Sequence, residues 1–155
     1  METDIQDFLT LLRKTYERDA WHGPSVKESI GNISDEHVFA RLPGTHSIIE
    51  LVAHMTAWRR YAIKKLMGES HYTVTDEMNF PNHDNWHEAV RQLEESQEQL
   101  VAVVGQCTQE KFRQLVPGTK NPLTFYTLLH GIIHHDLYHT GQIMLIRKAN
   151  TPQSL

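Results

Sequence analysis

The chain has little of several features that commonly assign a protein to a class. Its 155 residues include one cysteine, Cys107, which excludes an internal disulfide. No apolar run approaches the roughly 20 residues that a membrane-spanning helix needs. The N-terminal residues METDIQD lack the basic and then apolar pattern of a secretory leader. We therefore expect a cytoplasmic protein that does not enter a membrane.

Basic charge is also scarce. Lysine and arginine together number 15 against 19 aspartates and glutamates, giving a formal net charge of −4. Proteins that bind nucleic acids need a basic face for the phosphate backbone, so this balance argues against them as partners. A chain of this length can bury roughly two thirds of its unfolded surface in one core. We therefore treat residues 1–155 as a single domain.

Helical periodicity is the main pattern along the chain. Four segments carry apolar residues at the three-and-four spacing of an amphipathic helix, namely 3–18, 47–67, 84–105 and 123–148. Shorter helical turns are expected at 25–30, 35–41 and 108–115, and a long loop with little regular structure at 69–85. The polar middle of the third segment, residues 94–99, is predicted to face solvent. Because no strand-like alternation is present, the sequence predicts an all-α four-helix bundle.

Histidine, in contrast, is abundant, with 11 residues. His135 and His139 lie four apart, so on a helix they share one face with Cβ atoms about 5–6 Å apart. Both fall in the apolar stripe of the last segment, and His54 falls in that of the second. Burying three imidazoles without partners would cost on the order of 1–3 kcal/mol each. A shared divalent ion with one open position would satisfy them and would be typical of a catalytic metal site.

Two other readings of the same residues stay open at this point. A single histidine on an apolar face is more often a hydrogen-bonded core residue than a metal ligand. In addition, His130 and His134 have the same spacing and lie about 100° around the helix, and periodicity does not reject them. Neither pair has the glutamate of the zincin motif His-Glu-x-x-His. Asp136 is adjacent to His135 but is expected to point away from it.

Two motifs resemble a known family. Residues 50–54 (Glu-Leu-Val-Ala-His) with Trp58 one turn later, and residues 135–143 (His-Asp-Leu-Tyr-His-Thr-Gly-Gln-Ile), are similar to the DinB-like superfamily of metal-binding four-helix bundles. The superfamily includes bacterial thiol-dependent transferases, and the resemblance covers most of the chain. Its pattern has one histidine in the second helix and two, four apart, before a Gly-Gln pair in the last. The ligands that this pattern implies are His54, His135 and His139.

The resemblance also implies a chain path and a chemistry. The helices would run up-down-down-up, with the long loop between the second and third. A zinc or nickel ion on the three histidines would bind a low-molecular-weight thiol such as bacillithiol, mycothiol or glutathione, for attack on a small electrophile. Trp58 and Gln142 are candidates for contact with the cofactor, although Trp58 and Tyr61 also suit the core.

Three function classes therefore remain. The first is a metal-dependent thiol S-transferase acting on a small molecule, the second is a metal-dependent hydrolase, and the third is a non-catalytic metal-binding bundle. A homodimer is compatible with each. His22, Ser25 and His46 lie in predicted loops that could close over the site. Cys107 has no basic neighbour and is expected to be an inert thiol.

Overall fold

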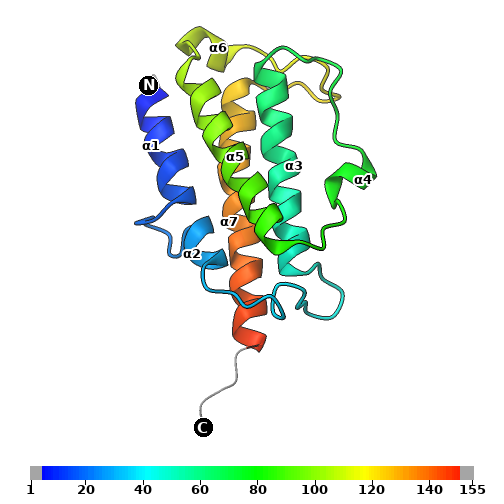
Figure 1. Ribbon diagram of the computed structural model, residues 1–155. Helices are drawn as coiled ribbons and strands as arrows, with labels where there is room; N and C mark the ends of the chain where they lie inside the picture. The colour runs from blue at the N-terminus through cyan, green and yellow to red at the C-terminus, as the bar shows by residue number, and fades with distance from the viewer. Residues whose placement is uncertain (1–4, 151–155) are drawn as a thin grey trace.

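Four long and three short helices make up the described part of the chain. The structure is a computed structural model that describes residues 5–150 (Figure 1). The long helices are α1 (Ile5–Tyr16), α3 (Ile48–Leu66), α5 (Trp86–Gly105) and α7 (Phe125–Asn150), and the short ones are α2 (Val26–Ile30), α4 (Asp76–Asn79) and α6 (Gln109–Arg113). Between residues 5 and 150 no β-strand forms, and a single isolated bridge pairs Leu115 with Thr124. The predicted all-α class is confirmed.

The long helices begin where the sequence offers a cap. Before α3, the backbone N–H and the hydroxyl of Ser47 donate to Oε2 of Glu50, at 2.6 and 2.8 Å. Before α5, the Asn85 side chain accepts from the Glu88 N–H at 3.0 Å. After α3, Gly68 takes a positive φ of 92°, which ends the helix without strain. The predicted limits of these two helices therefore agree with the structure within one or two residues.

The ends of the first and last helices differ somewhat more from their predictions. The predicted start of the first, Thr3, lies outside the described residues, and α1 ends at Tyr16 rather than Arg18. The helix α7 begins at Phe125, two residues after the predicted start, and continues to Asn150. Both differences are of the size by which fraying helix ends commonly vary.

Each long helix packs on two others. Helix α3 contacts α5 and α7, and α1 contacts the same two from the other side. In the view of Figure 1, α1 and α7 run downward while α3 and α5 run upward. All four contribute to both halves of the core. Typical members are Phe8, Ala62, Leu100 and Leu129 in one cluster, and Tyr16, Met55, Leu93 and Ile143 in the other.

The prediction that the middle of α5 faces solvent is wrong for two residues. Ser96 and Gln97 are buried, with 2% and 4% of their surface exposed. The Gln97 amide donates to the Leu12 carbonyl oxygen at 3.4 Å and accepts from Arg59 Nε at 3.3 Å. These partners come from α1 and α3, so the polar side chain is satisfied inside the bundle.

The loop between α3 and α5 is more ordered than predicted. Thr75 caps the short helix α4 by accepting from the Met78 N–H at 3.3 Å, and α4 packs against α3. Lys65 near the end of α3 is fully buried and positions the chain that follows the helix. Its ammonium group donates to the carbonyl oxygens of Ser70 and Pro117, at 2.6 and 3.0 Å. No helix in the described range has the length and apolarity to cross a membrane.

Candidate metal centre

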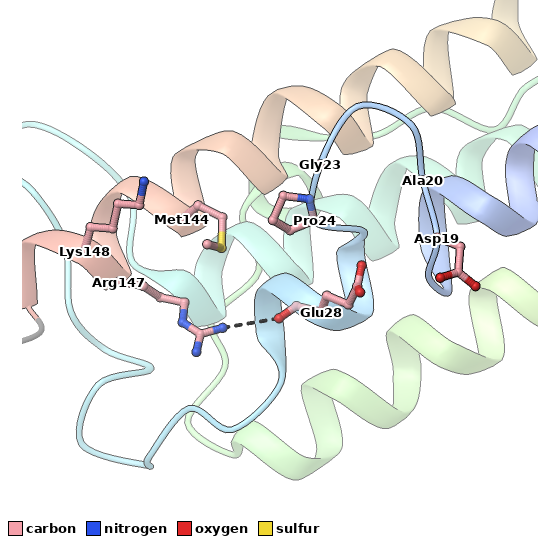
Figure 2. A pocket seen from close by; sticks show the side chains of 8 residues that line it. All are labelled: Asp19, Ala20, Gly23, Pro24, Glu28, Met144, Arg147 and Lys148. Carbon is pink, nitrogen blue, oxygen red and sulfur yellow. Dashed lines mark hydrogen bonds between the residues drawn. The ribbon is translucent and has the colours of Figure 1, made fainter.

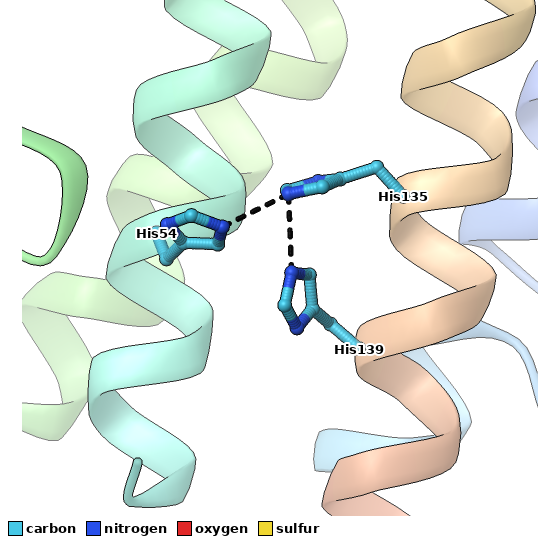
Figure 3. Close-up of side chains that lie close together, drawn as sticks. All are labelled: His54, His135 and His139. Atoms are coloured by element: carbon cyan, nitrogen blue, oxygen red, sulfur yellow. Dashed lines mark hydrogen bonds between the residues drawn. The ribbon is translucent and has the colours of Figure 1, made fainter. Parts of the chain in front are cut away.

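Three histidines from two helices that are distant in sequence meet in the bundle. His54 comes from α3, and His135 and His139 come from successive turns of α7 (Figure 3). The Nε2 atom of His135 lies 2.9 Å from that of His54 and 3.1 Å from that of His139. One ring nitrogen of each lies within 4.8 Å of the other two. The structure thus brings together the three residues that the family resemblance selects.

Hydrogen bonds fix the protonated nitrogen on two of the rings. His54 Nδ1 donates to the carbonyl oxygen of Asn79 at 2.6 Å, because a carbonyl can only accept. His139 Nδ1 lies 2.6 Å from Oε1 of Gln142 and donates to it in the same way. In the neutral rings both Nε2 atoms therefore carry lone pairs, and both face Nε2 of His135. That nitrogen has at most one proton and cannot satisfy both.

A divalent cation fits this arrangement. Two contacts join the three nitrogens, but at most one proton is available to bridge them, so their lone pairs repel one another unless a positive charge lies among them. In metal sites, carbonyl or amide oxygens usually accept from the other nitrogen of each ligating ring, as they do here for His54 and His139. Nitrogens that each lie about 2.0–2.1 Å from one zinc ion are roughly 3.3 Å apart. The observed 2.9 and 3.1 Å differ from this by shifts that side chains make easily.

The electrostatic surroundings keep the rings neutral. Burial lowers the pKa of His135 to about 3 and that of His139 to about 4, and it also lowers the pKa of His54. Repulsion from neighbouring imidazoles adds to the effect: His139 and His54 lower the pKa of His135, His54 and His46 lower that of His139, and His46 lowers that of His54. Since only the neutral imidazole binds a metal ion, the fold holds the histidines in the competent form near neutral pH.

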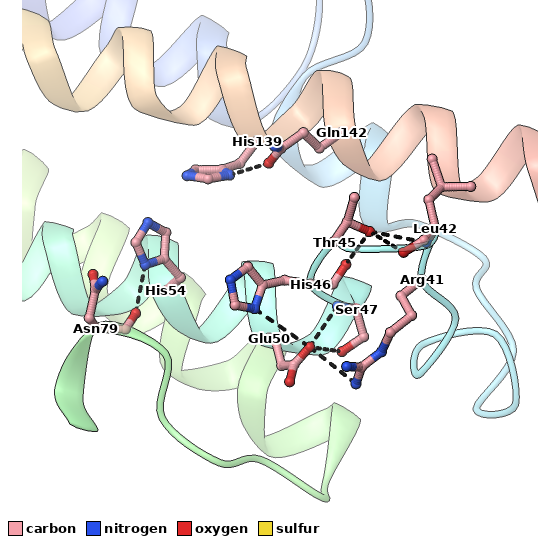
Figure 4. A network of polar contacts seen from close by, with 10 residues as sticks. All are labelled: Arg41, Leu42, Thr45, His46, Ser47, Glu50, His54, Asn79, His139 and Gln142. Carbon is pink, nitrogen blue, oxygen red and sulfur yellow. Dashed lines mark hydrogen bonds and ion pairs between the residues drawn. The ribbon is translucent and has the colours of Figure 1, made fainter. Parts of the chain in front are cut away.

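Two residues at the end of α4 that the sequence did not single out contact the triad or its neighbours: Asn79, the last residue of the helix, and Phe80, its C-cap. The Asn79 side chain accepts from Trp58 Nε1 at 3.0 Å while its carbonyl accepts from His54 (Figure 4). Phe80 stacks on His54 at a centroid distance of 4.1 Å and on His46 at 3.6 Å, both nearly parallel. Rings this close and parallel must occupy opposite faces of Phe80. The cap at Thr75 was a local signal for α4, but nothing local indicated its contact with α3.

The two candidates for cofactor contact, Trp58 and Gln142, both lie beside the triad. Gln142 orients His139, as described above. Trp58 is partly buried, with its ring 6.4 Å from that of His54 and 6.2 Å from that of His135. It also packs edge-on against Tyr61 at 5.4 Å. Trp58 therefore lies beside the histidines and also packs at the periphery of the core.

The competing pair His130 and His134 does not form a comparable cluster. Their ring centroids are 6.4 Å apart, and His134 is exposed. His130 packs against Phe8 and Tyr126, and its Nε2 is buried without a partner. Among residues 5–150, His54, His135 and His139 are the only group of three or more potential ligands close enough to share an ion.

The remaining candidates are distributed over the molecule. His46 lies near the triad, with Nδ1 3.9 Å from Oε2 of Glu50 (Figure 4). Ser25 is fully buried and caps α2 by accepting from the Glu28 N–H, while His22 is exposed. Burial raises the pKa of the Cys107 thiol, in agreement with an unreactive cysteine.

A buried polar network lies behind the histidines. Arg59 donates to Asp136 at 2.6 Å, and the two side chains are 0% and 1% exposed. Arg59 also lies over the Tyr16 ring at 5.1 Å and donates to Gln97. Burial raises the pKa of Asp136 to about 6, although the Arg59 charge opposes this. Asp136 thus faces Arg59 rather than the three histidines. Each of the four long helices contributes one residue to this network: Tyr16, Arg59, Gln97 and Asp136.

A cavity of about 430 Å³ adjoins the triad and includes His139, Gln142, His46 and Phe80 in its wall. A second cavity, of about 520 Å³, lies near the C-terminal end of α7 and is lined by Asp19, Ala20, Gly23, Pro24, Glu28, Met144, Arg147 and Lys148 (Figure 2). It contains none of the three histidines, so of these two cavities the first is the one that can present a molecule to them.

Comparison with known protein families gives a match, whereas no curated protein matches the chain. The family model described as the DinB superfamily matches residues 13–143, a range that contains His54, His135 and His139 and covers most of the chain. The chain therefore belongs to the DinB superfamily.

Proposed function

We propose that the protein is a metal-dependent enzyme in which His54, His135 and His139 bind one zinc or nickel ion. The observation that carries this proposal is the convergence of three Nε2 atoms, two of which are fixed as lone-pair donors by acceptors behind their rings. Imidazole nitrogens suit both metals, and three protein ligands are the number typical of catalytic rather than structural zinc.

The reaction that we propose is transfer of a low-molecular-weight thiol to a small electrophile. When bound, a divalent ion with an open position lowers the pKa of a coordinated thiol and so favours the thiolate near neutral pH. The sulfur forms a bond to the electrophilic carbon, the leaving group departs with the bonding electrons, and the thiol proton passes to solvent. Gln142 and the Asn79 carbonyl orient the ligating rings, and Phe80 and Trp58 shield them from water.

The test begins with metal analysis of protein purified without a histidine tag. We expect one ion per chain, lost in His54→Ala and retained in His134→Ala. Bacillithiol, mycothiol and glutathione are then screened with 1-chloro-2,4-dinitrobenzene as a generic electrophile. Product that requires both the ion and one of the thiols supports the proposal, whereas a fully active, metal-free His139→Ala variant refutes it.

A hydrolase is the second candidate, and one observation favours it. The cavity beside the histidines has no lysine or arginine in its wall to pair with the carboxylates of a charged thiol cofactor. In this case water takes the place of the thiol, and esters or amides are turned over with no thiol added. An absolute thiol requirement rejects the hydrolase. A stoichiometric ion without any turnover would point to a non-catalytic metal-binding bundle.

The wider setting of this activity is also part of the proposal. We infer that the long helices follow the up-down-down-up path, supported by the long connection that carries α4 back along α3 before α5 begins (Figure 1). We further propose one domain that works in the cytoplasm on a small molecule and not on nucleic acid, as the net charge of −4 suggests. The exposed aromatic side chain of Tyr126 on α7 suits a homodimer, which light scattering would test.

A further inference from the structure

The cavity beside the histidines has a wall without formal charge. Its lining residues are Leu42, Gly44, Thr45, His46, Leu51, Phe80, Tyr138, His139, Gln142, Leu145 and Ile146. None is a lysine, arginine, aspartate or glutamate, although such residues make up 22% of the chain. The larger cavity near the end of α7 has four charged residues in its wall, so the absence of charge is particular to the cavity that adjoins the triad.

We infer that this cavity, which we call the Leu145 pocket, binds an uncharged and mainly apolar small molecule. The inference rests on the proposed function, because it names the class of the electrophilic substrate. Leu42, Leu51, Leu145 and Ile146 offer aliphatic surface, and Phe80 and Tyr138 offer aromatic surface. Burying apolar groups against such a wall contributes favourable binding free energy. A charged group placed there loses its hydration without gaining an ion pair.

One polar group in the wall of the pocket is available to a hydrogen-bond acceptor on the substrate. Thr45 Oγ1 is occupied by the backbone of Leu42, at 3.0 and 2.9 Å. The Gln142 oxygen accepts from His139, and its amide nitrogen has no hydrogen-bond partner among the described residues. A single carbonyl or similar acceptor on an otherwise apolar molecule can therefore bond to Gln142 beside the candidate ion site.

Exposure of the pocket rim agrees with this reading. Leu145 is 61% exposed and Tyr138 is 64% exposed, although both are large side chains on the longest helix. A bound apolar molecule would cover part of that surface. Exposed apolar surface beside a cavity is a common mark of a ligand site.

The test compares two probes with the same apolar body, 4-phenylbutan-1-ol and 4-phenylbutylammonium. The protonated ammonium group cannot bind a metal ion, whereas the alcohol oxygen can, so the difference reports the charge tolerance of the wall once the metal has been removed. Calorimetric titration of the purified, metal-containing protein should show the alcohol binding at least about tenfold more tightly. Repeating the titration after removal of the metal by chelation separates the wall from the charge of the ion, and the preference should persist.

Two matched variants locate the effect. Leu145→Glu places a negative charge on the rim and should reduce the preference for the alcohol by at least about fivefold. Leu115→Glu changes a leucine of equal exposure, 63%, outside the pocket and should leave the preference unchanged. Equal binding of the two probes, no binding of the alcohol, or an equal effect of both variants would overturn the inference. Failure to find a metal ion would instead refute the proposed function and leave this comparison valid.

Discussion

Helix α7 carries two histidine pairs with the same spacing and very different surroundings. His135 and His139 face α3, where His54 completes a group of three, and their pKa values are lowered to about 3 and 4. His130 and His134 face Phe8, Tyr126 and solvent, and no third ligand approaches them within the described range. Spacing along one helix thus identifies pairs of possible metal ligands. Whether a pair can form a metal site depends on a third ligand from the opposite helix.

The sharpest test of this comparison is to remove one histidine from each pair. His135→Ala should abolish stoichiometric metal binding, because two nitrogens hold a divalent ion far more weakly than three. His134→Ala should retain one ion per chain. The measurement is elemental analysis after dialysis against buffer without metal. Equal loss of metal in the two variants would show that the pairs do not differ.

Substitution of Asp136, next to His135, tests how much the buried ion pair between Arg59 of α3 and Asp136 of α7 stabilises the packing of these two helices. Asp136→Ala leaves the fully buried Arg59 without its carboxylate and should lower the free energy of unfolding by about 3–5 kcal/mol. The measurement is urea unfolding of the metal-free protein, so that loss of the ion does not contribute. His134→Ala, an exposed position on the same helix, should change the stability by less than about 0.5 kcal/mol. A loss below about 1 kcal/mol for Asp136→Ala would show that the pair is not a main link between the helices.

The Gln142 side chain, which accepts from His139, is a further difference between the triad and the pair His130 and His134. We expect a smaller effect on metal binding from its removal than from the loss of a ligand. Gln142→Ala removes the partner of His139 Nδ1 and should weaken metal binding about 10–100-fold. The measurement is competition with a chromophoric chelator. Gln99→Ala, an exposed glutamine on α5, serves as the control. An unchanged affinity in Gln142→Ala would mean that the amide does not orient the ring.

The pH dependence of stability is expected to show the smallest difference between the triad and the other histidine pair. The lowered pKa values mean that the unfolded chain binds more protons than the folded one between about pH 6.5 and pH 4. The metal-free protein should therefore lose stability as the pH falls through this window, on the order of 1–2 kcal/mol by pH 5 for each of His135 and His139. Thermal unfolding in the presence of a chelator measures the loss.

The control for this experiment replaces all three rings. Combining His54→Gln, His135→Gln and His139→Gln should flatten the curve, whereas His134→Gln should not. Asp136, whose raised pKa acts in the opposite direction, is present in every variant and cancels in the comparison. A pH dependence unaffected by the triple change would contradict the assigned pKa shifts.

Much of the architecture follows from local signals. The caps at Ser47 and Asn85 and the stop at Gly68 are encoded within a few residues of the helix ends that they set. The facing of His54, His135 and His139 into the bundle follows from helical spacing, since apolar neighbours share their stripes. Choosing between the two pairs on α7 needed the family pattern, because both satisfy the same periodicity.

What escaped prediction depends on contacts between distant segments. Arg59 and Gln97 are polar residues whose burial is possible only because their partners arrive from other helices. Asn79 and Phe80 lie in a stretch without periodicity, so their positions against α3 were not predictable from local spacing. From the sequence, a charged or amide side chain is predicted to face solvent unless its hydrogen-bond or ion-pair partner is known.

The bond from His54 to Asn79 has a consequence for how the protein tolerates mutation. The acceptor is a backbone carbonyl, which every amino acid possesses, so exchanging the side chain at position 79 does not delete it. Lengthening or shortening the connection between α3 and α5 would displace that oxygen and leave the ring free to rotate. The orientation of this imidazole is therefore vulnerable to insertions and deletions in the loop far more than to point substitutions.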